Sequence, residues 1–244
     1  MGGVGGQSPT APRRLPALFL SSRCGLTEAA RPLPLIDRLV DVGSPIQAVV
    51  FITSQDELRQ PQVRSTQHGG AFCAELADVL TELGYPFSPS AACTPRVSVL
   101  ASMLFESLPA ECIELHLGLD MSLGQCRELG QALQNWRDRR VLLVCLDQIP
   151  LDIEPGSYCS PYDPYWRGLM QGWVEEQQWL NALPSSLSER SKRTAPGGQR
   201  QPAETSVCLL QAAFGLGGLR LPERLFGFDL DDSQRALSGF GWMH

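Results

Sequence analysis

Short apolar runs alternate along the chain with segments whose apolar residues recur at helical spacing. The apolar runs have the length of buried β-strands, and the segments between them have the periodicity of amphipathic helices. We predict strands at residues 15–21, 46–53, 112–117 and 140–146, and helices at residues 71–83, 97–108, 122–136 and 204–214. Gly84 directly follows one of these helices and is a typical stop signal. This alternation predicts an α/β fold of three layers, α/β/α, with a mostly parallel or mixed central sheet.

The remaining segments set the limits of the folded unit. Residues 1–14 are rich in Gly and Pro and are predicted to form a flexible tail, which leaves residues 15–244 as a single domain. A helix at residues 165–180 carries three tryptophans, and residues 185–202 are polar and predicted to be a surface loop. Two stretches near the end, residues 224–228 and 236–242, are candidate edge strands.

Composition narrows the class of protein. Of the 244 residues, 43% are hydrophobic and 19% are charged, which is typical of a globular protein with a sizeable core. Twenty Lys and Arg residues stand against 26 Asp and Glu residues, so the formal net charge is -6. Because nucleic-acid binders need a basic face, this balance argues against nucleic acid as a partner. No apolar stretch approaches the length of about 18 residues that a membrane helix requires, so no membrane span is predicted.

Eight cysteines occur without a Cys-x-x-Cys pair and without a following His at zinc-finger spacing. Several lie inside apolar segments, and Cys145 in particular is predicted to be a small buried hydrophobe. We interpret the cysteines as reduced thiols, which favours an intracellular protein. The first 27 residues hold three arginines and no acid before Glu28, a composition compatible with an organelle-targeting segment. A mitochondrial location is therefore favoured over a cytoplasmic one.

Candidate chemistry is sparse at the carboxyl ends of the predicted strands, where ligands bind in a sheet of this kind. The chain has three histidines, His68, His116 and His244, and their spacing does not indicate a metal site. His116 lies inside the predicted strand at residues 112–117, where a packed or hydrogen-bonded core residue is the simplest interpretation. The spacing of these residues gives no reason to expect a metal or another cofactor.

Four stretches of the chain together resemble a known family. They are Pro-Ala-Leu-Phe-Leu-Ser-Ser at residues 16–22, Ala-Val-Val-Phe at residues 48–51, Ser-Met-Leu-Phe at residues 102–105 leading to Ile-Glu-Leu at residues 113–115, and Leu-Ser-Gly-Phe-Gly at residues 237–241. In their character and order these stretches resemble the class III extradiol ring-cleavage dioxygenases of the DOPA 4,5-dioxygenase type. The resemblance extends over residues 15–242 and implies the same α/β fold.

The resemblance also implies where a metal site would lie. Members of this family hold one iron or zinc ion through histidines after the first strand, after the second strand and in a His-Pro-x-x-Glu-His segment. A further His after a later strand handles protons. The corresponding positions in this chain are Ser22, Ser54, the segment from Arg200 to Glu204, and the loop with Asp147 and Gln148. Only Glu204 matches the family's pattern, and none of its histidines is retained. Serine hydroxyls are weak neutral ligands and Arg cannot be a ligand, so the resemblance implies a site without metal and a protein without a cofactor.

The leading hypothesis is that the chain is a pseudoenzyme, because an α/β body can persist when the few residues that carry the activity are lost. On this hypothesis it is a non-catalytic, dioxygenase-like protein that acts as a structural or interaction subunit of a larger protein complex, for which a mitochondrial location is favoured. Its partners would be other protein subunits. The helix at residues 165–180, with its tryptophans, is a candidate interface, although core packing explains it equally well.

Two alternatives stay open at the level of sequence. One is an active extradiol dioxygenase, an oxidoreductase whose metal site has been rebuilt from other residues, such as His68, His116, Asp147 and Glu204. The other is a binding module that keeps a pocket for aromatic small molecules at the former metal site. Bound metal with catechol cleavage would distinguish the first, and stabilisation by catechols without turnover would distinguish the second.

Overall fold

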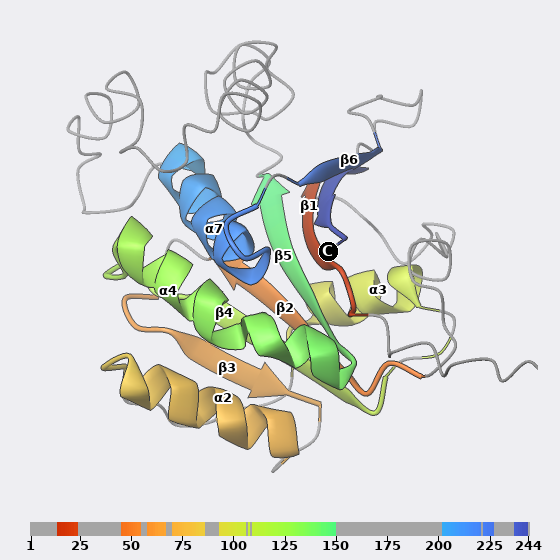
Figure 1. Ribbon diagram of the computed structural model, residues 1–244, viewed down its shortest axis with the longest axis horizontal. Helices are drawn as coiled ribbons and strands as arrows, with labels where there is room; N and C mark the ends of the chain where they lie inside the picture. The colour runs from red at the N-terminus through yellow and green to blue at the C-terminus, as the bar shows by residue number, and fades with distance from the viewer. Residues whose placement is uncertain are drawn as a thin grey trace, which may run out of the picture.

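One β-sheet organises the part of the chain that the structure describes (Figure 1). The computed structural model describes residues 14–23, 45–54, 58–66, 70–85, 93–105, 107, 109–149, 202–220, 222–226 and 237–243. The strands are β1 (Ala17–Arg23), β2 (Ala48–Ser54), β3 (Gln62–Ser65), β4 (Glu111–Leu117), β5 (Val141–Ile149), β6 (Glu223–Phe226) and β7 (Leu237–Trp242). The helices are α2 (Ala71–Glu82), α3 (Pro95–Leu104), α4 (Leu123–Leu133), the 3-10 helix η1 (Gln134–Arg139) and α7 (Pro202–Leu216).

The sheet is mixed, with a parallel centre and antiparallel margins. Its strand order is β3-β4-β2-β5-β1-β7-β6. The four strands β4, β2, β5 and β1 run parallel to one another, whereas β3, β7 and β6 each pair antiparallel with their neighbours. Parallel strands are covered on both faces, which is why β2 and β5 are nearly continuous runs of buried apolar residues. The predicted α/β fold with a mixed sheet is confirmed.

Helices pack on both faces of this sheet, and the alternation of side chains along each strand decides which residues they meet. On one face, alternate strand residues such as Ala17, Phe19 and Val50 share a core with residues of α2, α4 and α7. On the opposite face, the intervening residues such as Leu18 and Val49 share a second core with residues of α3. We call these two sides of the sheet the α7 face and the α3 face.

The helices α4 and α7 lie side by side on the α7 face, with their backbones in contact (Figure 1). A Cβ atom at Gly130 would lie 2.1 Å from the carbonyl oxygen of Ala212, and one at Gly215 would lie 2.2 Å from that of Arg127. Both distances are far inside van der Waals contact, so a larger side chain would push the two helices apart. Helix α7 is longer at both ends than the predicted helix at residues 204–214: Pro202 belongs to it and not to the predicted surface loop, and Gly215 packs against α4 inside the helix instead of ending it.

Local sequence signals determine several of the helix ends. The α4 helix begins with a capping box, in which Ser122 and Gln125 each accept a hydrogen bond from the other's backbone N–H. After α2 the backbone turns at Gly84, whose φ of 86° is the left-handed conformation expected of a stop signal. The predicted helix at residues 122–136 is regular only as far as Leu133 and continues as η1, a tightening that is common in a last helical turn.

Three elements differ from the prediction. β3 was expected to be part of a polar loop, but Val63 anchors a short strand because its buried side chain pairs with Leu115 of β4. The α3 helix ends four residues earlier than predicted, since Phe105 has an extended backbone conformation. β7 is not an edge strand, because it pairs with β1 on one side and with β6 on the other. For β3 and β7, pairing with a strand distant in the sequence overrides the local pattern.

The Arg137 side chain forms hydrogen bonds to three separate segments at one end of the sheet. It is fully buried, and it donates to the carbonyl oxygens of Leu15, Leu216 and Trp242 at 2.6, 3.0 and 2.5 Å. Burial lowers the pKa of Arg137 to about 10, so the group still carries its charge at neutral pH. Leu216 is the last residue of α7, where the helix dipole favours a cation. The start of β1, the end of α7 and the end of β7 are therefore held by one guanidinium group.

Some predictions fall on residues that the structure does not describe. The tail except for Arg14, the helix at residues 165–180 and the surface loop except for Pro202 lie outside the described ranges. The division into a tail and a single domain stays a prediction, although strands drawn from residues 17 to 242 join the same sheet. None of the helices in the described ranges is both long enough and apolar enough to cross a bilayer.

Replacing Arg137 with Ala should lower the free energy of unfolding by about 3 kcal/mol or more, because three buried carbonyl oxygens lose their donor. The matched control is Arg139→Ala in the same short helix, where the exposed guanidinium pairs with Glu75 and lies over the ring of Phe72. That substitution should cost about 1 kcal/mol or less. Urea denaturation monitored by circular dichroism measures both losses. Losses of equal size would contradict the role assigned to Arg137.

Candidate functional site

The carboxyl ends of β1, β2 and β5 meet at one edge of the sheet, where the resemblance to the dioxygenases would place a metal site. In the parallel pairing of β1 with β5, Ser22 is the register partner of Gln148, and the residue before it is the partner of Asp147. Ser54 is the last residue of β2, the neighbour of β5 on the other side. The positions taken from the first strand, the second strand and the proton-handling loop therefore come together in the fold.

The third predicted segment is described only in part. Glu204 lies in the first turn of α7, and Arg200 lies outside the described residues. Asp147 is buried, at 4% exposed, while Ser54 is half-buried. Cys145 belongs to the core of the α7 face and Leu146 to that of the α3 face, so Asp147 points to the α7 face.

His116 lies on the other side of the sheet from Asp147. On β4, Ile113 and Leu115 belong to the core of the α7 face, whereas Cys112 belongs to that of the α3 face. Alternation along the strand then places the His116 side chain on the α3 face. The sheet separates the two residues, and they cannot ligate the same metal ion. Among the residues that the structure describes, no group of three or more His, Cys, Asp and Glu side chains could hold a metal.

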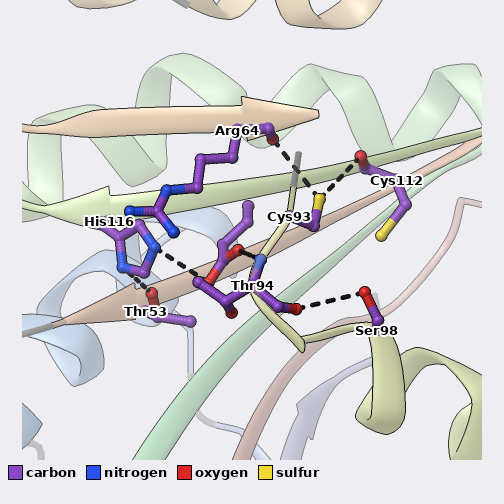
Figure 2. Close-up of polar contacts among 8 residues, drawn as sticks. Thr53, Arg64, Cys93, Thr94, Ser98, Cys112 and His116 are labelled. Carbon is purple, nitrogen blue, oxygen red and sulfur yellow. Dashed lines mark hydrogen bonds and ion pairs between the residues drawn. The ribbon is translucent and has the colours of Figure 1, made fainter. Parts of the chain in front are cut away.

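A buried polar network occupies the α3 face around β4 (Figure 2). The Thr53 hydroxyl and Nδ1 of His116 are 2.6 Å apart, and Nε2 of His116 lies 3.0 Å from Oε1 of Glu114. The side chains of His116 and Glu114 are each 1% exposed. The predicted interpretation of His116 as a hydrogen-bonded core residue is confirmed, because both of its ring nitrogens have a polar neighbour inside the protein.

Glu114 connects this network to the start of α3. The backbone N–H of Thr94, the residue that precedes the helix, donates to Oε2 of Glu114 at 2.6 Å, and the Thr94 hydroxyl donates to Oε1 at 2.7 Å. Burial raises the pKa of Glu114, but the bonds from His116 and Thr94 outweigh it, and the pKa lies below its usual value. The carboxylate is therefore ionised in the folded protein at neutral pH, and its negative charge lies at the positive end of the helix dipole.

A hydroxyl, an imidazole and a carboxylate in series are the components of a nucleophile activated by a general base. Such a series works only where a substrate can reach the hydroxyl. Here the Thr53 side chain lies in a strand at the centre of the sheet and the residue is 2% exposed. The arrangement therefore holds β2, β4 and α3 together, and we assign it no catalytic role.

A second acid on the same strand, Glu111, caps the start of a helix on the α7 face. Glu111 accepts hydrogen bonds from the backbone N–H groups of Cys73 at 2.9 Å and Phe72 at 3.4 Å, in the first turn of α2. The residue before this helix is Gly70, and a Cβ atom there would lie 2.2 Å from the Glu111 carboxylate. The carboxylate thus does what a side-chain cap at Gly70 would otherwise do.

No role was predicted for Glu111 or Glu114 from the sequence. The available signal was the presence of Glu111 and Glu114 in a strand whose neighbours are apolar, since charged residues are rarely buried without partners. The sequence does not show which partners they find, because the capped residues lie between 20 and 39 positions away.

Comparison with known proteins shows a similar fold and gives no information on activity. No family model matches the chain, and no curated protein matches it. Among solved structures, an uncharacterised protein of Escherichia coli K12, JW3007, is similar with a TM-score of 0.59 and 16% sequence identity. The likeness covers 93% of this chain and 99% of that one. At this level of identity it shows a shared fold alone.

Replacing Glu114 with Gln should lower the free energy of unfolding at pH 7 by about 2 kcal/mol, because charge-assisted bonds to His116 and Thr94 are lost. The folded pKa of Glu114 is below its usual value of 4.5. Its contribution is therefore fully present above that value and is lost as the pH falls through the folded pKa. Accordingly, the stability difference between wild type and variant should shrink at pH values below about 4.

Urea denaturation at neutral and acid pH measures this difference. Glu128→Gln, on an exposed position of α4, is the control and should change stability little at either pH. A Glu114→Gln difference that is the same at both pH values would show that the lost charge is not the cause.

Proposed function

We propose that this chain is a pseudoenzyme of the extradiol dioxygenase type that serves as a structural or interaction subunit of a larger protein complex. The observation that carries the proposal is the chemistry of the residues at the carboxyl edge of the sheet. Ser22 and Ser54 occupy the positions that would supply imidazole ligands, and the His116 ring is engaged on the opposite face. The described edge thus lacks the ligands that this chemistry requires.

Ring cleavage of a catechol requires a metal ion with an open coordination position and strong ligands that hold it. A serine hydroxyl is neutral and binds a divalent metal weakly, and a guanidinium cannot bind one because it has no free lone pair. Among the described residues at the former ligand and proton-handling positions, Asp147 and Glu204 carry carboxylates. Two carboxylates and two hydroxyls do not make the imidazole-rich site on which such an oxidation depends.

The body of the protein supports a scaffold role. Its two cores, one on each face of the sheet, are built from apolar side chains that are almost entirely buried. The stability of such a core depends on apolar patterning and not on the residues at the strand ends, so a fold can persist after the activity is lost. The fold shared with the Escherichia coli protein over most of both chains is consistent with this view.

The rebuilt oxidoreductase is the less favoured alternative. It would require His116 and Asp147 to contribute to the same site, and the sheet lies between them. The other two histidines, His68 and His244, lie outside the described residues. A mitochondrial location accompanies the main proposal and is supported by the arginines and the absence of acids in the first 27 residues.

The purified protein should bind neither iron nor zinc at one equivalent per chain, and it should not cleave a panel of catechols. The reason is the lack of imidazole at the positions of Ser22 and Ser54. Metal analysis after anaerobic incubation with ferrous iron, followed by oxygen uptake with each catechol, tests both statements. One tightly held equivalent of metal together with ring cleavage would replace this proposal with the rebuilt oxidoreductase.

In a gentle extract of the source organism, the protein should elute from gel filtration in a particle far larger than a single chain, because a subunit is held by its partners. Immunodetection of the fractions gives the size, and affinity capture from the large fraction gives the partners. The freely purified chain run on the same column is the control. Elution of the endogenous protein at the position of the free chain would contradict the subunit role.

A further inference from the structure

Cys93 differs in its surroundings from the other cysteines that the structure describes. It is partly exposed, whereas each of the other five is buried. It lies directly before Thr94, the residue at the start of α3 whose backbone N–H donates a hydrogen bond to Glu114. Cys145, by contrast, is enclosed in the core of the α7 face, and burial raises the pKa of its thiol. Within the described ranges, Cys93 is thus the most exposed cysteine.

A second cysteine, Cys112, lies against it. The Cys93 sulfur is 3.4 Å from the carbonyl oxygen of Cys112 and 3.8 Å from that of Arg64, and its thiol donates to both (Figure 2). The two residues come from different elements, since Cys112 is in β4 and Cys93 is in the turn before α3. Cys112 itself is 4% exposed. The fold therefore places a partly exposed cysteine against a buried one, on the same face of the sheet.

The two thiols differ in acidity: the pKa of Cys93 is lowered and that of Cys112 is raised. A hydrogen bond from the Cys112 thiol lowers the pKa of Cys93, and this effect outweighs burial and the nearby charge of Glu114. The same bond, together with burial, raises the pKa of Cys112. Because the thiolate is the reactive form, Cys93 is the group that attacks an electrophile, and Cys112 is positioned to react afterwards.

We propose that Cys93 and Cys112 form a reversible disulfide when the protein meets a hydroperoxide. In the first step the Cys93 thiolate attacks one oxygen of hydrogen peroxide, the O–O bond breaks, and Cys93 becomes a sulfenic acid as hydroxide leaves. In the second step the Cys112 thiol attacks the Cys93 sulfur, an S–S bond forms, and water leaves. Overall, two thiols lose two electrons and one peroxide molecule becomes two molecules of water.

The bond would link the residue before α3 directly to β4, beside the carboxylate that already caps this helix. Its reduction by a small thiol would release the link. The proposal goes beyond the role as a subunit and does not depend on it, because it concerns the α3 face and not the edge with Ser22 and Ser54. A catalytically active protein with the same two cysteines would be expected to form the same bond.

The test is peroxide treatment of the full-length protein, followed by alkylation of the remaining thiols in denaturant and mass spectrometry. Digestion after glutamate is informative, because glutamates separate Cys73 from Cys93 and Cys112 from Cys126 in the sequence. We expect a peptide pair joined through Cys93 and Cys112 that disappears on reduction. In native alkylation before oxidation, Cys93 should react at least about tenfold faster than the other described cysteines.

Variants distinguish this pair from other arrangements. Cys112→Ser should leave Cys93 as a sulfenic acid that dimedone traps, and Cys93→Ser should abolish both the disulfide and the dimedone adduct at this site. Cys73→Ser is the matched control, since the charge of Cys93 also affects the pKa of Cys73, and the disulfide should persist in it. A link from Cys93 to any other cysteine would overturn the proposal. So would peroxide oxidation of wild-type Cys93 without a link, a result that needs no variant to fold.

Discussion

The Arg137 guanidinium joins three backbone segments that meet at one end of the sheet. Its three acceptors are backbone carbonyls before β1, at the last residue of α7 and at the last residue of β7. A buried cation without acceptors would be expensive, but here three carbonyl dipoles, one of them at a helix C-terminus, replace the lost water. Arg137 thus holds the C-terminal end of α7, while apolar residues of α7 in the core of the α7 face pack it against the sheet. Trp242 adds a further link by donating from its ring nitrogen to the carbonyl of Arg220.

In strand β4, buried negative charges are likewise compensated by backbone hydrogen bonds. It is buried along its whole length, and a buried strand tolerates a carboxylate only where donors surround it. Glu111 and Glu114 are three positions apart, so they point to opposite faces, and each meets the first backbone N–H groups of a helix. One strand thereby fixes where α2 begins on one face and where α3 begins on the other. Thr53 and His116 then complete the polar contacts on the α3 face without opening it to solvent.

The sequence predicted those parts of the fold that depend on local pattern. Continuous apolar runs located β2 and β5, helical periodicity located α2 and α4, and Gly84 marked a helix end where the backbone takes a positive φ. The pattern did not locate β3, whose four residues contain one apolar side chain and are held by their partner strand.

The interactions that matter most were beyond this kind of prediction. Arg137 binds residues 79 to 122 positions away, and such pairs leave no periodic signal in one chain. For the candidate site, the sequence placed Ser22, Ser54 and Gln148 at the carboxyl ends of parallel strands, as the structure has them, while their role as former metal-site positions stays a prediction. It did not show that His116 and Asp147 belong to opposite faces, because that depends on the register of alternation within each strand.

The place of β1 in the sheet has a consequence for how the chain is made. Ala17 pairs with Leu143 on one side and with Trp242 on the other, so β1 emerges from the ribosome long before either partner strand. At a synthesis rate of roughly 5–20 residues per second, the second edge of β1 stays open for on the order of 10 to 45 seconds. Until β5 has been made, both edges of this apolar strand are unpaired, which makes it a natural target for chaperones and for mispairing with neighbouring nascent chains.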